Sequence, residues 1–183
     1  MQSGIEQQKF GEALPDFYLS DLKGRSVGLS SALAGKKGGV VVFWSSTCSH
    51  CVRYDSYLNS FETNHPEMAL IVVAARSGET LAGVQKAATQ RDLSFTLLHD
   101  PTSKTAGSWY TQQTPRAFLM DSHRKLLYRG AIDNYKFAGD SERIDYLEPA
   151  IGEFLSGAEI TRPETASFGC AIQSVYYTLP KAL

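Results

Sequence analysis

The chain has 183 residues, 43% of them hydrophobic and 20% charged, and a formal net charge of −1. This length supports a single domain with a sizeable core. Because the charges nearly balance, we expect no basic face for nucleic acid or an anionic membrane. No apolar run approaches the ~20 residues of a membrane span, and the polar first residues lack the apolar stretch of a signal peptide. Three cysteines are too few for a disulfide-stapled scaffold.

The first predicted element is a β-hairpin. Two short apolar segments, residues 17–19 and 27–29, flank a turn-forming sequence at 21–24, a pattern typical of two antiparallel strands. Residues 30–33 then predict a short helix, which ends before the Gly- and Lys-rich loop at 35–39. The hairpin and this helix therefore precede the central strands.

A redox motif follows the next predicted strand. Residues 40–43 form an apolar run, and residues 44–51 read Trp-Ser-Ser-Thr-Cys-Ser-His-Cys. The Cys-x-x-Cys spacing alone also fits half of a zinc site, but structural zinc takes four ligands. Strand context followed by an amphipathic segment favours a thioredoxin-like redox motif. We therefore expect Cys48 to be the nucleophile and Cys51 the resolving thiol.

The segment after the motif predicts one amphipathic helix. Cys51, Tyr54, Leu58 and Phe61 are spaced by three and four residues, so they share one face, and Pro66 ends the segment. Cys48 is then expected at the helix N-terminus, where free amides and the macrodipole favour a thiolate.

Alternating strands and helices continue down the chain. Residues 69–74 predict a strand covered on both faces, and residues 95–98 predict a shorter one. Between them, Leu81, Val84 and Ala88 predict a helix. Its expected N-cap is either Ser77 or Thr80.

The last third predicts a short helix, a second hairpin and a final helix. The short helix spans 100–110, and its aromatic pair Trp109-Tyr110 is expected to pack in the core. The hairpin strands are 116–120 and 125–129. The final helix places Ile144, Leu147, Ile151 and Phe154 on one face, with Pro149 predicting a kink or split inside it.

Several segments resemble the thioredoxin superfamily and, within it, the redoxin branch of peroxiredoxin-like proteins and TlpA/ResA-type bacterial thiol-disulfide oxidoreductases. Residues 43–51 look like the active-site segment of that branch, and Leu14-Pro15-Asp16-Phe17 is similar to its N-terminal hairpin. Thr114-Pro115 matches the cis-proline position of the superfamily. Residues 168–172 resemble the tail of a peroxiredoxin-like subgroup that ends in a Gly-Cys motif.

The resemblance and the element order imply an α/β fold of the thioredoxin-like three-layer type. Its mixed central sheet would carry helices on both faces, an N-terminal hairpin and a C-terminal arm. The redoxin domain is expected over residues 8–158, with residues 159–183 as an arm packed on it through apolar side chains, among them Val175, Tyr176 and Tyr177. Pro115, with Thr114, would present its backbone to a bound substrate strand.

The chain departs from the families it resembles at several positions. Peroxiredoxins place proline seven and threonine three residues before the peroxidatic cysteine, where this chain has Val41 and Ser45. Thioredoxins place a buried aspartate six residues before the first cysteine, where this chain has Val42. Membrane-tethered relatives carry a glutamate where this chain has Tyr54. The neighbouring Asp55 is either a proton relay or an ordinary solvated carboxylate.

Four residues are expected to support the two cysteines. An imidazolium at His50 can stabilise the Cys48 thiolate and so make the disulfide a stronger oxidant; alternatively, His50 is an exposed histidine of minor effect. Its Ser-His pair resembles the Pro-His of bacterial disulfide oxidants more than the Gly-Pro of thioredoxins. The other supporting residues are Trp44, Ser49 and Thr114.

Cys170 has two open roles. It is a possible third thiol if the tail folds back over the motif, or a small buried side chain that anchors the arm beside Phe168 and Ile172. The anchor is the favoured interpretation. It predicts a Cys48–Cys51 disulfide with Cys170 free.

The sequence thus predicts a thiol-disulfide oxidoreductase that contributes to cell redox homeostasis and antioxidant activity. It would exchange disulfides with protein partners and a recycling reductase or oxidant, as a monomer without cofactor or metal. A thiol peroxidase using Cys48 is the enzymatic alternative. The non-enzymatic alternative is a copper or zinc module built from Cys48, Cys51 and His50. A removed export signal would place the protein in the periplasm or another extracytoplasmic compartment, and otherwise it would be cytoplasmic.

Overall fold

A seven-stranded mixed sheet lies at the centre of the computed structural model, which describes residues 7–135 and 142–173. Its strand order is β2-β1-β5-β4-β3-β7-β8. Strand β4 runs parallel to both β3 and β5, and the remaining neighbours are antiparallel. A separate pair is formed by β6 and β9. The strands are β1 Tyr18–Asp21, β2 Ser26–Gly28, β3 Gly38–Trp44, β4 Met68–Ala74, β5 Leu97–His99, β6 Gln113–Thr114, β7 Arg116–Asp121, β8 Leu126–Gly130 and β9 Cys170–Ala171.

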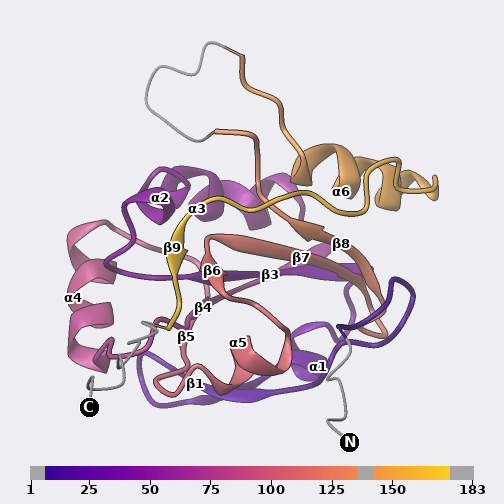
Figure 1. Cartoon of the computed structure of the whole chain (residues 1–183). Coiled ribbons are helices and arrows are strands. Elements are labelled where there is room, and N and C mark those ends of the chain that lie inside the picture. Colours follow the sequence, from indigo (N-terminus) through magenta and orange to yellow (C-terminus); the bar gives the residue numbers. More distant parts are fainter. Residues whose placement is uncertain (1–6, 136–141, 174–183) are drawn as a thin grey trace, which may run out of the picture.

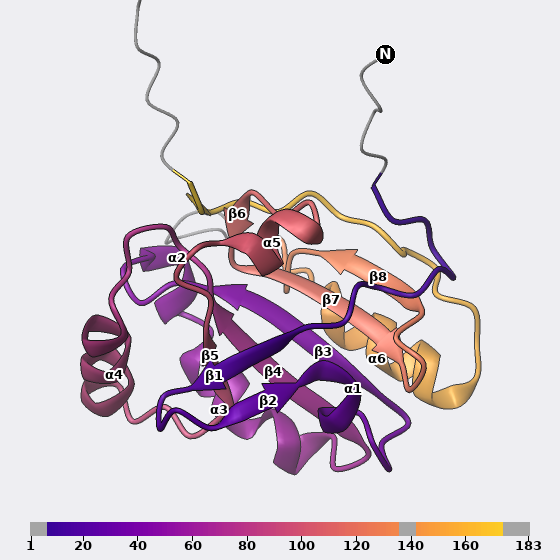
Figure 2. The same ribbon diagram turned by 90° about the horizontal axis from the view of Figure 1, so that it is seen from below.

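Helices cover both faces of the sheet (Figures 1 and 2). Side chains of α3, α4 and α6 enter the core on one face, and those of α1 and α5 enter the core on the other. The predicted three-layer α/β class, with both hairpins, is confirmed. The helices are α1 Leu29–Ala32, α2 Ser49–Val52, α3 Asp55–Asn64, α4 Leu81–Gln90, α5 Lys104–Ser108 and α6 Leu147–Ser156.

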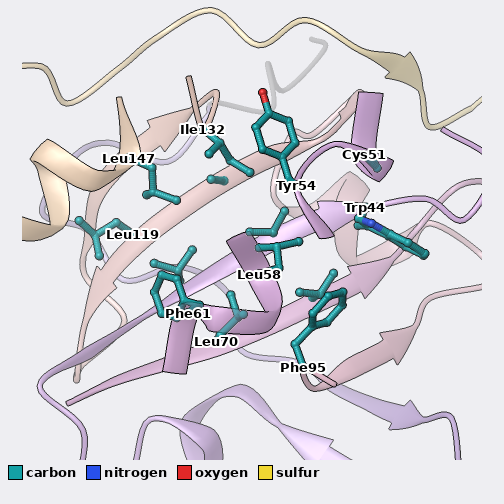
Figure 3. Close-up of a cluster of buried hydrophobic side chains, with 14 of the residues drawn as sticks. Trp44, Cys51, Tyr54, Leu58, Phe61, Leu70, Phe95, Leu119, Ile132 and Leu147 are labelled. Atoms are coloured by element: carbon teal, nitrogen blue, oxygen red, sulfur yellow. The ribbon is translucent and has the colours of Figure 1, made fainter. Parts of the chain in front are cut away.

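The two central strands divide the core into two halves. All residues of β3 and β4 are buried, as expected for strands between two helical layers. Along β3, Val42 and Trp44 point to the α3 side and Val41 and Phe43 to the α5 side, because side chains alternate along a strand. Figure 3 shows the α3 side, where Trp44 lies in the same cluster as Cys51, Leu58 and Phe61.

The helix after the motif is split in two, which corrects the prediction of one continuous helix. Helix α2 ends at Val52, and α3 begins at Asp55 after the non-helical residue Tyr54. The predicted face survives the break, since Cys51, Tyr54, Leu58 and Phe61 all lie in the same buried cluster. Apolar spacing reports which side chains are buried, and it does not detect a local break in the backbone.

Helix α6 begins later than predicted and carries no kink at Pro149. Tyr146 precedes its first residue, so Pro149 lies in the first helical turn, where a missing N–H interrupts no intrahelical hydrogen bond. Ile144 lies outside the helix and is exposed. The predicted split at Pro149 is therefore wrong.

Two local predictions are confirmed, the Thr80 N-cap and the burial of Trp109, whereas Tyr110 is half-buried and the prediction that it packs in the core is wrong. Thr80 is the N-cap of α4, and its hydroxyl accepts a hydrogen bond of 3.1 Å from the Gly83 amide. Trp109 is buried in the core, edge-on to Phe43 at 5.6 Å between ring centroids. None of the helices within the described ranges is long and apolar enough to cross a membrane.

The described part of the C-terminal segment, residues 159–173, runs along β8 and ends beside β6 (Figure 1). Glu164 pairs with Arg129 at 2.7 Å, and the Thr165 hydroxyl accepts from the Ala131 amide at 3.0 Å. Further on, Ile172 is buried in the α5-side core. The segment is therefore held on both sides of Cys170. Val175, Tyr176 and Tyr177 lie outside the described residues.

Candidate functional site

The two motif cysteines lie where β3 ends, at the carboxyl edge of the parallel strands. Cys48 is the N-cap residue of α2, and its carbonyl accepts a hydrogen bond of 3.0 Å from the Cys51 amide. This single turn brings both side chains to the same side of the backbone, and each is completely buried. Helix α2 has four residues, so the sulfur is positioned by local contacts more than by a long helix.

A cis proline lies against the first cysteine. The Thr114–Pro115 peptide bond is cis, and the Cys48 sulfur lies 3.3 Å from the Thr114 carbonyl oxygen. The predicted cis bond and its place beside Cys48 are confirmed. Pro115 thus joins the motif from a segment more than 60 residues away.

Hydrogen bonds make Cys48 an acidic thiol. Its pKa is lowered to about 4, chiefly because the Cys51 thiol donates to the Cys48 sulfur. Burial works in the opposite direction, while donation from the Cys170 thiol, Thr114 and the Cys170 amide lowers the pKa further. A thiolate is both the attacking and the metal-binding form of cysteine, so Cys48 is poised to react.

Cys51 has the opposite tendency. Burial raises the pKa of its thiol well above the ordinary value, and the neighbouring Cys48 sulfur raises it further. The pair therefore shares one proton unequally, with the negative charge on Cys48 and the proton on Cys51. Such asymmetry is what the predicted division into nucleophile and resolving thiol requires.

The structure brings Cys170 to the same place. Its thiol and its amide both lie within hydrogen-bonding reach of the Cys48 sulfur, and strand β9 pairs Cys170 directly with Thr114. Cys48 is 0% exposed, whereas Cys170 is half-buried. Of the three thiols, Cys170 is therefore the most accessible in this arrangement.

The predicted supporting residues have different surroundings. His50 is half-buried, and its ring meets Phe168 edge-on at 5.1 Å between centroids, so it contacts the C-terminal segment instead of standing exposed. Trp44 is completely buried beneath the motif. Ser49 is exposed as the first residue of α2.

A glutamate that the sequence did not single out organises the loop before Cys48. One carboxylate oxygen of Glu79 accepts hydrogen bonds from the Ser45 hydroxyl at 3.0 Å, the Ser46 hydroxyl at 2.6 Å and the Thr47 amide at 3.2 Å. These bonds fix the backbone that leads into Cys48. Glu79 is more than 30 residues from this loop in the sequence, so no local sequence pattern predicts the contact.

Arg91 is the second residue that the sequence did not reveal. Its guanidinium lies 4.7 Å from the centre of the Trp44 ring and donates to the Ser46 carbonyl at 3.2 Å. It also donates to both Asp55 oxygens at 2.6 Å. Asp55 is therefore a partner of Arg91, and its interpretation as a solvated carboxylate is wrong.

A polar pocket of about 490 Å³ opens beside Pro115. At its wall the Tyr54 hydroxyl donates to the buried Asp133 carboxylate at 2.5 Å, and this contact together with burial raises the pKa of Tyr54. Phe168 from the C-terminal segment lines the same pocket. Within residues 7–135 and 142–173, no group of three or more His, Cys, Asp or Glu side chains is arranged to hold a metal ion.

Comparison with known proteins identifies the family. The Redoxin family model matches residues 9–145. Thiol-disulfide oxidoreductase ResA of Geobacillus thermodenitrificans is 29% identical over 116 residues, which are 63% of this chain and 66% of the relative. The match thus spans slightly less than two thirds of that relative's length.

Two solved structures share the fold over nearly the whole chain. An uncharacterized conserved protein from Geobacillus kaustophilus has a TM-score of 0.82 at 19% identity and covers 91% of this chain and 93% of its own. A hypothetical protein from Sinorhizobium meliloti has a TM-score of 0.81 at 24% identity and covers 91% and 95%. The thioredoxin domain of a thiol-disulfide oxidoreductase from Bacteroides vulgatus has a TM-score of 0.59 at 22% identity and covers 67% of this chain and 89% of its own, which confirms the predicted thioredoxin-like fold. Since the family model spans more than half of the sequence, the chain belongs to the Redoxin family.

Proposed function

We propose that the chain is a thiol-disulfide oxidoreductase that exchanges disulfides with protein partners through Cys48 and Cys51. The observation that carries this proposal is the opposite acidity of the two neighbouring thiols, one with a pKa of about 4 and one with a raised pKa. The name of the ResA relative supports the same activity.

The proposed reaction has two exchange steps. The Cys48 thiolate attacks one sulfur of a partner disulfide, forms a mixed disulfide and releases the other partner sulfur as a thiolate. Cys51 then loses its proton and attacks the Cys48 sulfur, which frees the second partner sulfur. Two electrons pass to the partner, and the protein keeps a Cys48–Cys51 disulfide. A separate reductant would have to restore the thiols, and the reverse sequence would oxidise a partner dithiol.

The environment of Cys48 favours a relatively oxidising disulfide. Hydrogen bonds that stabilise the thiolate stabilise the reduced form, and this raises the reduction potential. We expect a potential above the roughly −270 mV that is typical of thioredoxin. Equilibration of the protein with a glutathione buffer, followed by alkylation of free thiols, measures it.

A direct test is turnover of a protein disulfide, with insulin as the probe and a dithiol as the reductant. The wild-type chain should accelerate insulin reduction, and Cys48→Ser should abolish the acceleration. Cys51→Ser should instead accumulate a mixed disulfide with the partner, since the second step is lost. Ser56→Ala is the matched control, because this side chain is exposed on α3 and lies outside the motif. Full activity in Cys48→Ser would overturn the proposal.

Two further measurements test the alternative functions. Rapid consumption of hydrogen peroxide would favour the thiol peroxidase, and a metal ion retained in stoichiometric amount on purification would favour the copper or zinc module.

An extracytoplasmic location and a monomeric state complete the proposal. Labelling of intact cells with a membrane-impermeant thiol reagent tests the first, and sedimentation of the purified chain tests the second.

A further inference from the structure

The chain's own C-terminal segment occupies the edge of the site. Strand β9 is antiparallel to β6, with Cys170 opposite Thr114 and Ala171 opposite Gln113. The Ile172 amide donates to the Gln112 carbonyl at 2.9 Å. Figure 1 shows β9 crossing between α2 and β6. This edge is where Thr114 and Pro115 were expected to receive a substrate strand, and main-chain pairing of that kind is how an added strand binds a sheet edge.

The strand presents a cysteine to the nucleophile. The Cys48 thiol contacts the Thr114 carbonyl at 3.3 Å, and Cys170 is the direct partner of the same Thr114. The two sulfurs therefore flank one residue of β6. Burial and the neighbouring Cys48 sulfur raise the pKa of Cys170, while the positive charge of Arg76 and an amide hydrogen bond from His50 act in the opposite direction.

The close packing of the segment against β6 leaves no room for a side chain at position 169, next to Cys170. A Cβ atom at Gly169 would lie 1.9 Å from the Thr114 carbonyl oxygen, far inside van der Waals contact. The backbone of the segment can approach β6 this closely because residue 169 is glycine. Ile172 on the other side is buried in the core, which keeps Cys170 over Cys48.

We propose that Cys170 is a third redox-active thiol, delivered to Cys48 in the manner of a substrate cysteine and able to replace Cys51 as its disulfide partner. This inference rests on the proposed function, since it concerns the same nucleophile. It revises the interpretation of Cys170 as an anchor only.

The exchange balances without an external reagent. Starting from the Cys48–Cys51 disulfide, the Cys170 thiolate attacks the Cys48 sulfur; the Cys48–Cys51 bond breaks and a Cys48–Cys170 bond forms. Cys51 leaves as a thiolate and takes the proton that Cys170 lost. Before and after the exchange, the three cysteines form one disulfide and one thiol, and no electrons are gained or lost.

The proposal also assigns a gating role to the segment. While β9 is paired with β6, Cys48 is completely buried, and a partner strand must displace β9 to use the same edge. A small disulfide does not occupy this edge, so the segment can open to admit it and then pair with β6 again. Cys170 should therefore resolve mixed disulfides with small thiols, whereas a bound protein strand keeps it away.

The test uses Cys51→Ser in the full chain, oxidised with glutathione disulfide. The Cys48 thiolate forms a mixed disulfide with one glutathione and releases the other. Cys170 then attacks the Cys48 sulfur and releases the second glutathione, so that one glutathione disulfide becomes two thiols. The expected product has lost two hydrogens and carries a Cys48–Cys170 peptide cross-link by mass spectrometry. In Cys51→Ser/Cys170→Ser, the glutathione adduct on Cys48 should persist instead.

A second variant tests the geometry without removing a thiol. Gly169→Ala in the Cys51→Ser background should slow closure of the Cys48–Cys170 disulfide by about tenfold or more, because the new methyl group cannot fit against Thr114. Gly152→Ala in α6 is the matched control, since its Cβ meets nothing within 4 Å. Closure at the unaltered rate in Gly169→Ala would overturn the placement of Cys170 by β9.

The outcomes separate this inference from the proposed function. A persistent glutathione adduct in Cys51→Ser, with Cys170 free to react with an alkylating agent, would overturn the third thiol even if the wild type reduces insulin. Failure of the wild type to reduce insulin would overturn the proposed function, whereas formation of the Cys48–Cys170 cross-link would still support the inference.

Discussion

Cys48 combines complete burial with an acidic thiol, and its acidity comes from donors on its own motif, on β6 and on β9. Burial alone would raise its pKa, yet donors from Cys51, Cys170 and Thr114 lower it to about 4. Hydrogen bonds to a charged acceptor are stronger than neutral ones, so several of them outweigh the loss of water. The reactivity of this residue thus depends on three segments meeting at one sulfur.

The first prediction concerns the titration of Cys48. In the reduced protein, we expect the ultraviolet absorption of a thiolate to appear with a midpoint near pH 4, corresponding to one thiolate per chain at neutral pH. Cys51 and Cys170 should stay protonated there, because burial raises the pKa of each. Cys48→Ser should lack this step. A wild-type thiolate that appears only above neutral pH would contradict the prediction.

The second prediction concerns the pair between Asp55 and Arg91, which holds Arg91 beneath the motif. Asp55→Ala removes both carboxylate oxygens that accept from a guanidinium that is 18% exposed, and should lower the free energy of unfolding by about 2–3 kcal/mol. Urea unfolding measures this loss. Glu62→Ala on the same helix is the control, since this residue is exposed, and should change stability by less than about 0.5 kcal/mol. Equal effects of the two substitutions would show that the pair contributes nothing.

At the scale of elements, local sequence signals located most helices and strands, although their ends depended on neighbours. The N-cap of α4 is one boundary with a local cause, because the Thr80 hydroxyl satisfies the Gly83 amide. The start of α6 is different. Its predicted pattern included Ile144, but the chain around this residue pairs with the segment at 132–134 instead, and the helix begins at Leu147.

The third prediction uses the two N-cap candidates of α4. Thr80→Ala should lower the free energy of unfolding by about 1 kcal/mol, because the Gly83 amide loses its acceptor at the helix start. The comparison is Ser77→Ala, which retains the backbone hydrogen bond from the Ser77 amide to the Ile172 carbonyl. Its effect should stay below about 0.5 kcal/mol. A larger loss in Ser77→Ala than in Thr80→Ala would move the cap to residue 77.

At the scale of the whole molecule, the protonation of Cys48 is coupled to the stability of the fold. A thiol whose pKa is lower in the folded state binds fewer protons there than in the unfolded chain. Between about pH 4 and about pH 8.5, the unfolded state therefore holds an extra proton at Cys48, and stability rises with pH. The stabilisation from Cys48 is complete above the pKa that its thiol has in the unfolded chain. It is lost as the pH falls through the pKa of the same thiol in the folded protein.

The fourth prediction follows from this linkage. The stability of the reduced wild type relative to Cys48→Ser should increase between about pH 5 and about pH 7, with a slope of at most about 1.4 kcal/mol per pH unit. Carboxylates with lowered pKa values, such as Asp16 and Glu164, are present in both proteins and cancel in the difference. Urea unfolding of the two reduced proteins at several pH values measures it. A difference that does not change with pH would refute the linkage.

The sequence by itself determined the class of the protein and the core of its site. The apolar runs at β3 and β4 and the Cys-x-x-Cys spacing are local signals, since such patterns involve neighbouring residues only, and the Thr-Pro pair matches the cis-proline position of the superfamily that the chain resembles. They predicted a mixed sheet with helices on both faces and a cis Thr114–Pro115 bond, and both are present.

The tertiary structure alone decided what surrounds the two cysteines. Glu79 and Arg91 hold the loop before Cys48 from helices and loops elsewhere in the chain, and β9 brings Cys170 to the edge of β6. Each of these contacts joins residues more than 30 positions apart. Such contacts form only when the sheet order places distant segments together. A sequence pattern involves residues that are near each other along the chain, so it does not predict which edge of the sheet a later segment will occupy.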